Sequence, residues 1–337
     1  MKPTIKDVAE KAGVSKSTVS QFLNKRYSYM SEATRKKIEA AIKELNYYPN
    51  QIAKSLKQKD TRLIAFVCST LSSRFSLELV RAIEGFFQTE KYSIVVTSTE
   101  DDPNRERELI ESFVARQVDG LLVFPTAENE SLYQELQDRK IPLVFIDRVL
   151  PELTVPSVLL DNEQATATAT QLLIDNGHRD IAIITFPLGD RITTRFERLN
   201  GYKKTLAKNK ISEHSEFMVT CQQSEVGEKL DELFSRTHKP TAVLATNDMI
   251  LEAVLIWSKD KKISIPDTFS LLGIDDVSFA RLHTPEITTL AQPVDAIGTK
   301  ASELLLKQIQ ENVSDEKKVY RYSTQLIERE SVKRIQQ

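Results

Sequence analysis

The sequence is poor in the residues that build metal centres and disulfide frameworks. Its 337 residues include two cysteines and four histidines. Cys68 and Cys221 each lie in an apolar run typical of a strand, so we expect two reduced thiols in the core of a cytosolic protein, and not a disulfide or zinc framework. The histidines, which show no spacing typical of metal ligands, are His178, His214, His238 and His283.

Long hydrophobic runs are also missing. No stretch approaches the roughly 18–20 uncharged apolar residues that span a bilayer, which excludes a transmembrane helix and a membrane partner. Charged residues near the start, such as Lys6 and Asp7, leave no apolar segment for a signal peptide, so we expect a cytoplasmic protein. Glycine-rich phosphate loops and the short motifs of zinc enzymes and serine hydrolases are absent. The sequence therefore predicts neither an enzyme, nor a catalytic residue, nor a cofactor, nor a metal.

Charge is nearly balanced overall but unevenly distributed. The formal net charge is -2, whereas residues 1–60 hold 13 Lys and Arg against 6 Asp and Glu, a net of +7. The remainder therefore carries a net of -9. Such an asymmetry between a small basic module and a large acidic body predicts that the small part meets a polyanion.

The basic module shows helical periodicity only. Residues 5–12 place apolar side chains on one helix face, Thr4 can cap this helix, and Gly13 ends it. A second helix is predicted over residues 16–24, and a third begins after Ser31. Two short helices joined through a glycine turn form a helix-turn-helix candidate.

The second predicted helix has two different faces. Val19, Phe22 and Leu23 can pack inward together with Thr18, whereas the opposite face is polar. Glutamine can bond to adenine and lysine to guanine in the major groove. An isolated polar face is usually only solvated, but the local charge, the glycine turn and the third amphipathic helix all favour DNA binding. The polar residues are Lys16, Ser17, Ser20, Gln21 and Asn24.

From residue 63 onward the periodicity changes. Apolar strand-like runs alternate with helix-length segments, which is typical of βαβ units and parallel sheets. Nine such strands exceed one comfortable sheet, so we predict two doubly wound lobes with a cleft at the strand ends. Terminal strands are expected within residues 319–330. The nine runs are 63–69, 92–99, 120–125, 142–147, 157–161, 181–186, 216–221, 242–247 and 269–275.

These motifs together resemble the LacI/GalR family of bacterial transcription regulators. The N-terminal match comprises TIKDVAEKAGVS from Thr4, then TVS, LNY and AKSL, and the later match comprises DNGHRDIAII, RLNGY, PTAVLATND, LLGIDD and TPEITTLAQP. The resemblance implies an all-α helix-turn-helix DNA-binding domain followed by an α/β periplasmic-binding-protein-like core of two doubly wound parallel-sheet lobes. The implied parts are a DNA-binding domain at 1–48, a hinge helix and linker at 49–60, and an effector-binding and dimerisation core at 61–337, with an N-lobe of about 61–161 plus 291–322 and a C-lobe of about 162–290 plus 323–337.

The resemblance also implies how the module binds DNA. A hinge helix of about seven residues near 50–57 is too short to be stable alone and would fold when paired with its dimer mate on DNA. Leu56 stands where the family inserts a leucine into the minor groove, which kinks the duplex. A twofold dimer would bind a near-palindromic operator. The implied contacts with double-stranded operator DNA are Thr4, Ser15, Lys16, Ser17, Thr18, Ser20, Gln21, Asn24, Asn50, Ala53, Lys54 and Leu56.

An effector site is expected just after the strands, because ligands in such sheets bind outside the carboxyl ends of strands. Aspartate and asparagine suit sugar hydroxyls, Phe75 suits stacking on a sugar ring, and Arg198 suits a carboxylate or phosphate. The number of arginines favours a sugar acid or sugar phosphate over a neutral sugar. The implied effector-binding residues are Arg74, Phe75, Asp147, Arg148, Asp161, Arg191, Thr194, Arg195, Arg198, Gln223, Asn247 and Asp275.

The function that the resemblance implies is a cytoplasmic, nucleoid-associated repressor of carbohydrate-utilisation genes. A secreted sugar-binding protein would share the core but would have no use for residues 1–57. A global carbon-catabolite regulator that uses a phosphoprotein corepressor belongs to the same family and stays open as an alternative.

We also expect a homodimer. By the family resemblance, residues 77–87 and 279–284 lie where the cores pair, although several of their apolar side chains are equally compatible with the interior of a lobe. No heptad repeat follows Glu330, which favours a dimer over a tetramer built by a C-terminal coiled coil. The side chains compatible with either role are Leu79, Ile83 and Phe86.

Overall fold

The computed structural model describes residues 3–28, 30–48, 61–189, 192–311 and 318–335. The chain divides into two compact units, residues 1–61 and residues 62–337. The hinge helix expected near residues 50–57, with Asn50, Ala53, Lys54 and Leu56, lies outside the described residues, as does Arg191.

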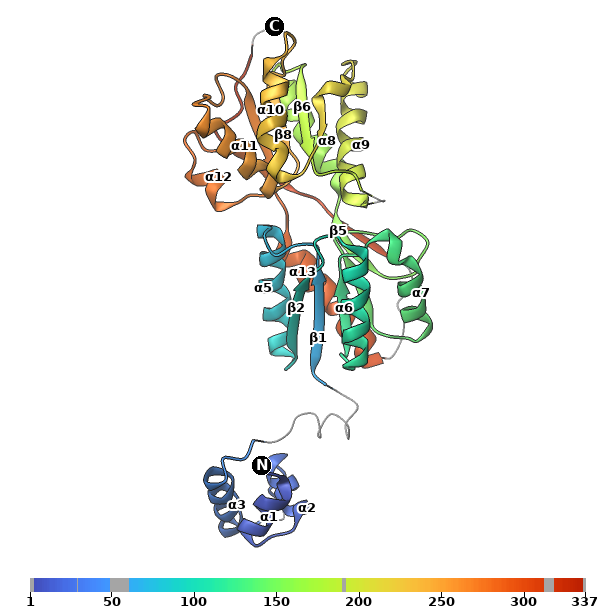
Figure 1. Cartoon of the computed structure of the whole chain (residues 1–337), viewed down its shortest axis with the longest axis vertical. Helices are drawn as coiled ribbons and strands as arrows, with labels where there is room; N and C mark the ends of the chain where they lie inside the picture. Colours follow the sequence, from blue (N-terminus) through green and yellow to red (C-terminus); the bar gives the residue numbers. More distant parts are fainter. Residues whose placement is uncertain (1–2, 29, 49–60, 190–191, 312–317, 336–337) are drawn as a thin grey trace. The chain divides into compact units, whose positions relative to one another are not determined.

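The N-terminal unit is built from the three helices expected from the sequence, α1 (Ile5–Ala12), α2 (Lys16–Leu23) and α3 (Glu32–Glu44) (Figure 1). Their apolar faces share one small core, in which Val8, Val19 and Ile38 are completely buried. Ser15 and Ser31 cap α2 and α3 by accepting hydrogen bonds from backbone N–H groups in the first turns. Capping of this kind fixes where short helices begin.

The turn between α1 and α2 depends on Gly13. This glycine has φ of 64°, in the left-handed region that favours glycine. The N–H of the next residue, Val14, donates to the carbonyl of Ala9 at 3.0 Å and closes the helix end. The turn directs the chain from α1 into α2 within three residues, as a helix-turn-helix motif requires.

The second unit begins with a lobe whose sheet has six parallel strands in the order β11-β5-β4-β3-β1-β2. Side chains of β1 alternate between its faces, with Phe66 packed among residues of α5 and α13 and Val67 among residues of α6 and α7. Helices therefore cover both faces. The elements are β1 (Leu63–Cys68), α5 (Arg74–Thr89), β2 (Ser93–Ser98), α6 (Pro103–Ala115), β3 (Gly120–Val123), η1 (Ala127–Asn129), α7 (Glu130–Asp138), β4 (Leu143–Ile146), β5 (Ser157–Leu160), α13 (Val294–Glu311) and β11 (Val319–Tyr322).

The other lobe repeats this plan with the strand order β12-β10-β9-β8-β6-β7, in which only β12 runs antiparallel to its neighbour among the described strands. Residues of α10 and α11 pack on one face of its sheet and residues of α8 and α9 on the other. The elements are α8 (Asn162–Asp175), β6 (Ile181–Thr185), α9 (Thr193–Lys208), η2 (Ser215–Phe217), β7 (Met218–Thr220), η3 (Gln223–Glu225), α10 (Val226–Ser235), β8 (Ala242–Ala245), α11 (Asp248–Asp260), β9 (Ser270–Ile274), α12 (Ser278–Leu282), β10 (Thr288–Ala291) and β12 (Gln325–Ile327).

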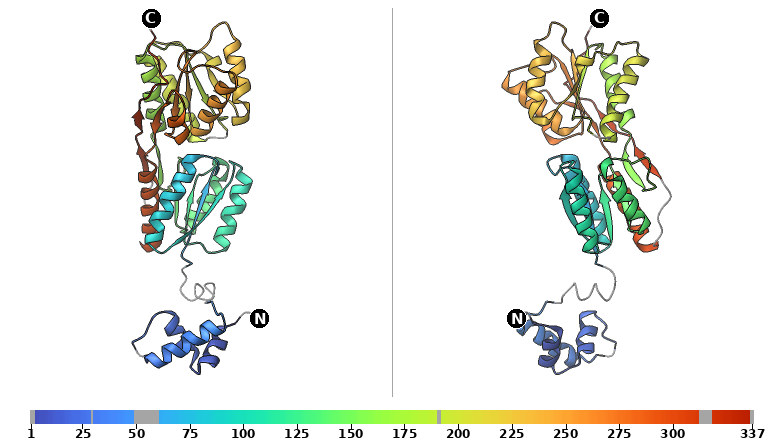
Figure 2. Two further views of the ribbon diagram at one scale, coloured as in Figure 1. Left: turned by 90° about the vertical axis from the view of Figure 1, so that its left-hand side faces the viewer. Right: turned by 45° about the vertical axis from the view of Figure 1, so that its right-hand side comes forward.

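The chain passes between the two lobes after β5, after β10 and between β11 and β12 (Figure 2). The two terminal strands expected from the sequence therefore belong to different sheets. β10 was not among the expected strands, because it is a short Thr-Thr-Leu-Ala segment without a long apolar run. The two parallel-sheet lobes expected from the strand–helix alternation are confirmed.

Both cysteines are free and buried, as expected. Burial raises the pKa of Cys68 to about 12 and that of Cys221 to about 11, so both thiols stay protonated near neutral pH. Among the described helices, none combines the length and the apolar character needed to cross a bilayer.

Candidate functional site

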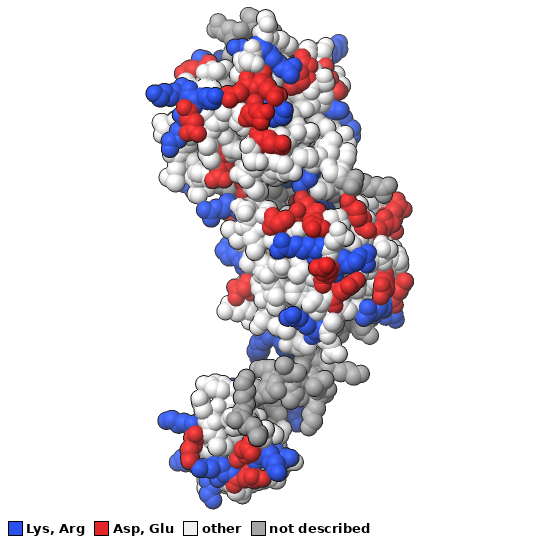
Figure 3. Space-filling model, viewed as in Figure 1, with Lys and Arg blue, Asp and Glu red and all other residues white. Residues whose placement is uncertain are grey.

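The outward face of α2 is polar, as the sequence predicts. Lys16, Ser17 and Gln21 are exposed, Ser20 is half-buried, and Val19 is buried on the opposite face. Phe22 and Leu23 pack against the helical core. Figure 3 shows Lys and Arg side chains over the visible face of this unit, with Asp and Glu side chains between them. The DNA major groove is wide enough to admit an α-helix, and the donors and acceptors on this exposed face are of the kind that bond to base edges there.

Four other residues implicated in DNA contact also organise helix ends. The hydroxyl groups of Ser15 and Thr18 lie 2.8 Å apart at the start of α2. The side-chain amide of Asn24 donates to the carbonyl of Ser20 at 2.9 Å. The backbone N–H and the hydroxyl of Thr4 both donate to the Asp7 carboxylate, at 2.7 Å and 2.8 Å, and these two bonds lower the pKa of Asp7. These residues hold the motif in shape.

A cavity of about 500 Å³ lies within the second unit, between the lobes. Its lining comes from segments at the carboxyl ends of strands in both sheets, where parallel α/β sheets place their ligands. The lining residues that follow strands include Ser69, Thr70, Phe124, Asp147, Arg148, Phe186, Gln222, Thr246, Asn247, Asp275 and Gln292.

The structure brings together nine of the twelve residues implicated in effector binding. Arg74 is not among the described lining residues of the cavity, and Asp161 instead caps α8 by accepting from the N–H of Gln164 at 3.0 Å. Arg191 lies outside the described residues. The nine that line the cavity are Phe75, Asp147, Arg148, Thr194, Arg195, Arg198, Gln223, Asn247 and Asp275.

Asp101 joins two arginines across the cavity. Its Oδ1 accepts from Arg148 and its Oδ2 from Arg195 of α9, both at 2.6 Å. Burial by itself would raise the pKa of Asp101, but the two guanidinium groups outweigh burial and hold the pKa below its ordinary value. The arginines expected to converge on a ligand anion thus already share a protein carboxylate.

Arg148 nevertheless keeps open donors. Its side chain is 4% exposed, and its Nε and NH1 atoms have no hydrogen-bond partner among the described residues. The Oδ2 of Asp147 lies 3.8 Å from Nε, beyond hydrogen-bond distance. Leaving donors of a buried guanidinium unsatisfied is costly. Both atoms are themselves shielded from solvent, so in this arrangement they lie beneath the cavity wall and do not face its interior.

Arg198 has a different role. Its Nε donates to the Asn162 side chain at 2.9 Å, and its NH1 donates to the carbonyl of Thr246 at 2.6 Å. Both partners come from segments at the carboxyl ends of strands, so Arg198 holds the loop after β8 against the start of α8. It lines the cavity and fixes the loop that carries Asn247.

Two carboxyl groups meet at the other side of the cavity. The Oδ2 of Asp275 accepts from the backbone N–H of Asp248 at 3.1 Å, and its Oδ1 accepts from Gln292 at 2.6 Å. Burial, together with the Asp248 carboxylate, raises the pKa of Asp275 to about 7. This group therefore changes its charge near neutral pH.

Asp101, Asp248 and Gln292 also line the cavity. Of these three, the rule on carboxyl ends of strands identifies Asp248 from the sequence, because Asp248 follows the strand run at 242–247. Asp101 follows a strand that the sequence also reveals, so the same rule, applied to every strand, would have selected it. Gln292 follows β10, which the apolar pattern did not reveal.

Comparison with known proteins decides the family. The lacI family of bacterial regulatory proteins matches residues 4–50, and a periplasmic binding protein-like domain matches residues 170–332. The probable HTH-type transcriptional regulator EndR of Paenibacillus polymyxa is 48% identical over 339 residues, which cover 99% of this chain and 100% of EndR. The chain belongs to the LacI family of bacterial transcription regulators. It is a DNA-binding regulator and not an enzyme.

Solved structures agree with this assignment over nearly the whole chain. The Lac repressor dimer bound to operator and the anti-inducer ONPF matches with a TM-score of 0.84 and 25% identity, covering 99% of this chain and 100% of that chain. The complex of the transcriptional regulator CelR with cellobiose matches with a TM-score of 0.72 and 28% identity, covering 98% of this chain and 99% of that chain. The helix-turn-helix fold and the two-lobed core implied by the resemblance are confirmed.

Proposed function

We propose that this LacI-family protein represses carbohydrate-utilisation genes by binding a near-palindromic operator as a homodimer, under the control of a sugar-type effector in the cavity between its lobes. The observation that carries the proposal is the polar cavity between the lobes, which is lined by carboxyl, guanidinium, hydroxyl and amide groups, in a chain that also has a helix-turn-helix unit. In this proposal residues 1–48 bind DNA, residues 49–60 connect them to the core, and the protein acts in the cytoplasm at the nucleoid.

DNA reading is assigned to the exposed face of α2. Gln21 and Lys16 supply donors of the kind that read base edges, and Ser17 and Ser20 are short enough to let the helix lie close to them. Eight-residue helices present few such side chains, so one module reads a short half-site. A twofold dimer doubles the contacts and requires inverted half-sites.

Exposed apolar side chains support the dimer. Leu282 of α12 is 82% exposed and Leu77 of α5 is 42% exposed, and both lie in the segments expected to pair. Leu79 and Ile83 of α5 are instead completely buried in their lobe core. Phe75, Val80 and Phe86 also pack against this core, so Leu77 is the apolar side chain of α5 that is available to a second copy, where burial would contribute favourable free energy.

The charges of the cavity fit a ligand rich in hydroxyl groups. Among its described lining residues, five carry carboxyl groups and three carry guanidinium groups, and the rest of the polar lining consists of Ser, Thr, Asn and Gln. Hydroxyls both donate and accept, so one sugar can bond to the carboxyl groups and to the donors of the lining together. Phe75 and Phe186 add apolar surface for a ring face. These features favour a neutral sugar over a sugar phosphate.

The position of the cavity between the lobes explains how an effector would control operator binding. A ligand that contacts both lobes binds best to one arrangement of the lobes, and it shifts the equilibrium only by the difference in its affinity for the two arrangements. Because the DNA-binding module is attached at the amino end of β1, a change between the lobes of a dimer alters how far apart the two modules are held.

The test begins with the operator. Selection from random duplexes with the full-length protein is expected to yield an inverted repeat, and calorimetry with cellobiose, galacturonate and glucose 6-phosphate then identifies the effector class. We expect tightest binding of the uncharged sugar and a change in operator affinity on its addition. Selection of no duplex at all contradicts the proposed function.

The variant Arg148→Met tests the role of this side chain, because methionine keeps an unbranched apolar chain but has none of the guanidinium N–H donors. It should lose at least about tenfold in sugar affinity, since a hydrogen bond to a charged group is worth about 1.5–3 kcal/mol, while effector-free operator binding persists. If instead no sugar binds but a phosphorylated carrier protein strengthens operator binding, the chain is a phosphoprotein-dependent regulator.

A further inference from the structure

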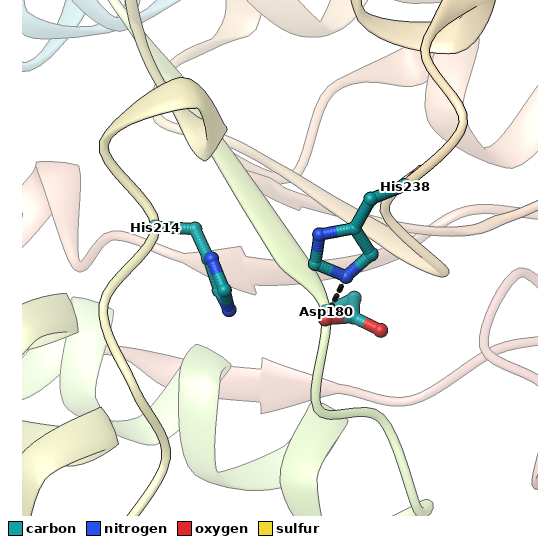
Figure 4. Close-up of side chains that lie close together, drawn as sticks. All are labelled: Asp180, His214 and His238. Carbon is teal, nitrogen blue, oxygen red and sulfur yellow. Dashed lines mark hydrogen bonds and ion pairs between the residues drawn. The ribbon is translucent and has the colours of Figure 1, made fainter.

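A second group of polar side chains lies at the amino ends of three strands of the C-lobe sheet, whereas the cavity lies at the carboxyl ends of the strands. Asp180 directly precedes β6, His214 lies shortly before β7, and His238 lies shortly before β8 (Figure 4). These strands are parallel neighbours in the order β8-β6-β7, so their amino ends meet at one edge. The sequence does not reveal the group, because its members come from three separate segments.

The three side chains are close enough to share one ion. The Nε2 of His238 lies 2.8 Å from the Oδ1 of Asp180, and one potential ligand atom from each of Asp180, His214 and His238 lies within 4.8 Å of the other two. Ligand atoms around tetrahedral zinc lie about 3.4 Å apart, given metal–ligand distances of about 2.0–2.2 Å. Small side-chain rotations would bring the three atoms to that spacing.

The surroundings hold both imidazole rings in place. Phe217, which is buried, packs against the ring of His214 at 5.3 Å and against that of His238 at 5.1 Å between centroids. The carbonyl of Asp180 accepts from the N–H of Thr241 at 2.7 Å, which fixes the backbone of Asp180 to the sheet. The site is therefore supported by the core of the lobe.

We propose that Asp180, His214 and His238 bind one divalent transition-metal ion of the zinc class. Two imidazole nitrogens and one carboxylate oxygen suit zinc, whereas magnesium prefers six oxygen ligands. The side chains of His214 and His238 are 34% and 49% exposed, so an ion reaches them from solvent. The Glu216 carboxylate, 3.7 Å from Nδ1 of His214, can orient that ring or add a fourth ligand.

The ion would act on stability and not on effector binding. It would link the amino ends of β6, β7 and β8, whereas the cavity is lined by residues after their carboxyl ends. A ligand that binds only the folded state raises the melting temperature by mass action. The proposal is thus independent of the proposed function of the cavity and of the operator.

The test uses the full-length protein without an affinity tag, titrated with zinc chloride and separately with magnesium chloride. We expect one zinc ion per chain, no magnesium binding, and a higher melting temperature with zinc only. His214→Gln and His238→Gln should each lower zinc affinity at least tenfold and abolish the thermal shift. His283→Gln, in which a histidine outside the site is replaced, should bind zinc like the unaltered protein.

A more conservative substitution tests the site without disturbing the fold. In Asp180→Asn the amide oxygen still accepts from His238, but the neutral amide is a poor zinc ligand, so folding is kept and zinc affinity falls. Cobalt(II) should give the strong visible absorption of a tetrahedral site in the unaltered protein and lose it in this variant. Failure of the unaltered protein to bind zinc, or equal affinity in the two histidine variants and the His283 control, overturns the proposal.

Discussion

Asp248, the first residue of α11, spans the cavity and accepts a hydrogen bond from the backbone N–H of Arg74, the first residue of α5. The first N–H groups of a helix have no partner within the helix, and they favour a negative charge. The same carboxylate also accepts from the hydroxyl of Ser73 at 3.1 Å. One acidic side chain of the C-lobe thus caps a helix of the N-lobe and holds the lobes together.

This contact predicts the effect of Asp248→Ala on the dynamics of the core. Without the carboxylate, the Arg74 amide loses its acceptor, and the lobes separate more readily. A charged hydrogen bond contributes about 1.5–3 kcal/mol, so amide exchange in the peptide spanning residues 69–76 should accelerate at least about tenfold. Hydrogen exchange followed by mass spectrometry, without effector, measures this.

The matched control lies on the same helix. Asp260→Ala makes the same substitution at the exposed last residue of α11 and should leave exchange in residues 69–76 unchanged. Ser73→Ala removes only the hydroxyl and should give an intermediate effect. Unaltered exchange at Arg74 in Asp248→Ala would show that the lobes are held by other contacts.

Asp101→Ala tests the carboxylate shared by Arg148 and Arg195. Arg148 is buried, and removing one partner of a buried ion pair leaves an uncompensated charge, which costs about 3–5 kcal/mol. Because the Asp101 side chain is 23% exposed and water can partly replace it, we expect a loss near the lower end of that range. Urea denaturation at neutral pH measures the free energy of unfolding.

Asp175→Ala serves as the comparison for this loss. Asp175 is the exposed last residue of α8 and accepts from Gln171 of the same helix, so its removal should cost less than about 0.5 kcal/mol. Equal losses in the two variants would mean that the Asp101 bridge does not contribute to folding.

The sequence predicts the framework of this protein better than the contacts within its site. Hydrophobic periodicity reveals nine strands and three N-terminal helices, because buried strands and amphipathic helices need apolar side chains at fixed intervals. The hydrophobic pattern does not predict β10, because its residues Thr288 and Thr289 have polar side chains and are nonetheless buried. The rule that ligands bind at the carboxyl ends of strands identifies the residues that follow the strands. It does not identify the side chains with which those residues form hydrogen bonds and ion pairs.

Arg148 illustrates that limit. Its place after β4 follows from the sequence, but its pairing with Asp101 depends on how far two loops from different strands extend. The grouping of Asp180 with His214 and His238 has the same origin, since strand order brings together segments that are distant along the chain. Spacing along the sequence carries no trace of either contact.

Asp275 makes stability depend on pH. Burial and the neighbouring Asp248 raise its folded-state pKa to about 7, above the ordinary value of 3.8. The folded state therefore binds the proton more tightly than the unfolded state, so this contribution to stability is present at low pH and is lost as pH rises toward about 7. The slope is at most about 1.4 kcal/mol per pH unit.

Asp275→Asn tests this dependence, because asparagine resembles the protonated acid and does not titrate. Relative to the unaltered protein, the variant should gain stability steadily between about pH 4 and about pH 7 and keep a constant difference above that. Urea denaturation across this range gives the two profiles. Parallel profiles would show that Asp275 stays ionised throughout.

The exposed face of α2 leads to a prediction on DNA binding. Gln21→Ala removes a side chain able to bond to a base edge, so affinity for the selected operator should fall by about 1–3 kcal/mol while affinity for a scrambled duplex hardly changes.

Lys16→Ala removes one positive charge near the duplex. As a phosphate contact, Lys16 should account for about 0.9 of the slope of log affinity against log salt, and the variant should lose that part. Lys208→Ala makes the same charge change on exposed α9 of the core and controls for net charge. Fluorescence anisotropy with the operator and its scrambled counterpart at several salt concentrations measures both effects. A Gln21→Ala variant that loses equal affinity for both duplexes would remove this residue from sequence reading and restrict α2 to backbone contact.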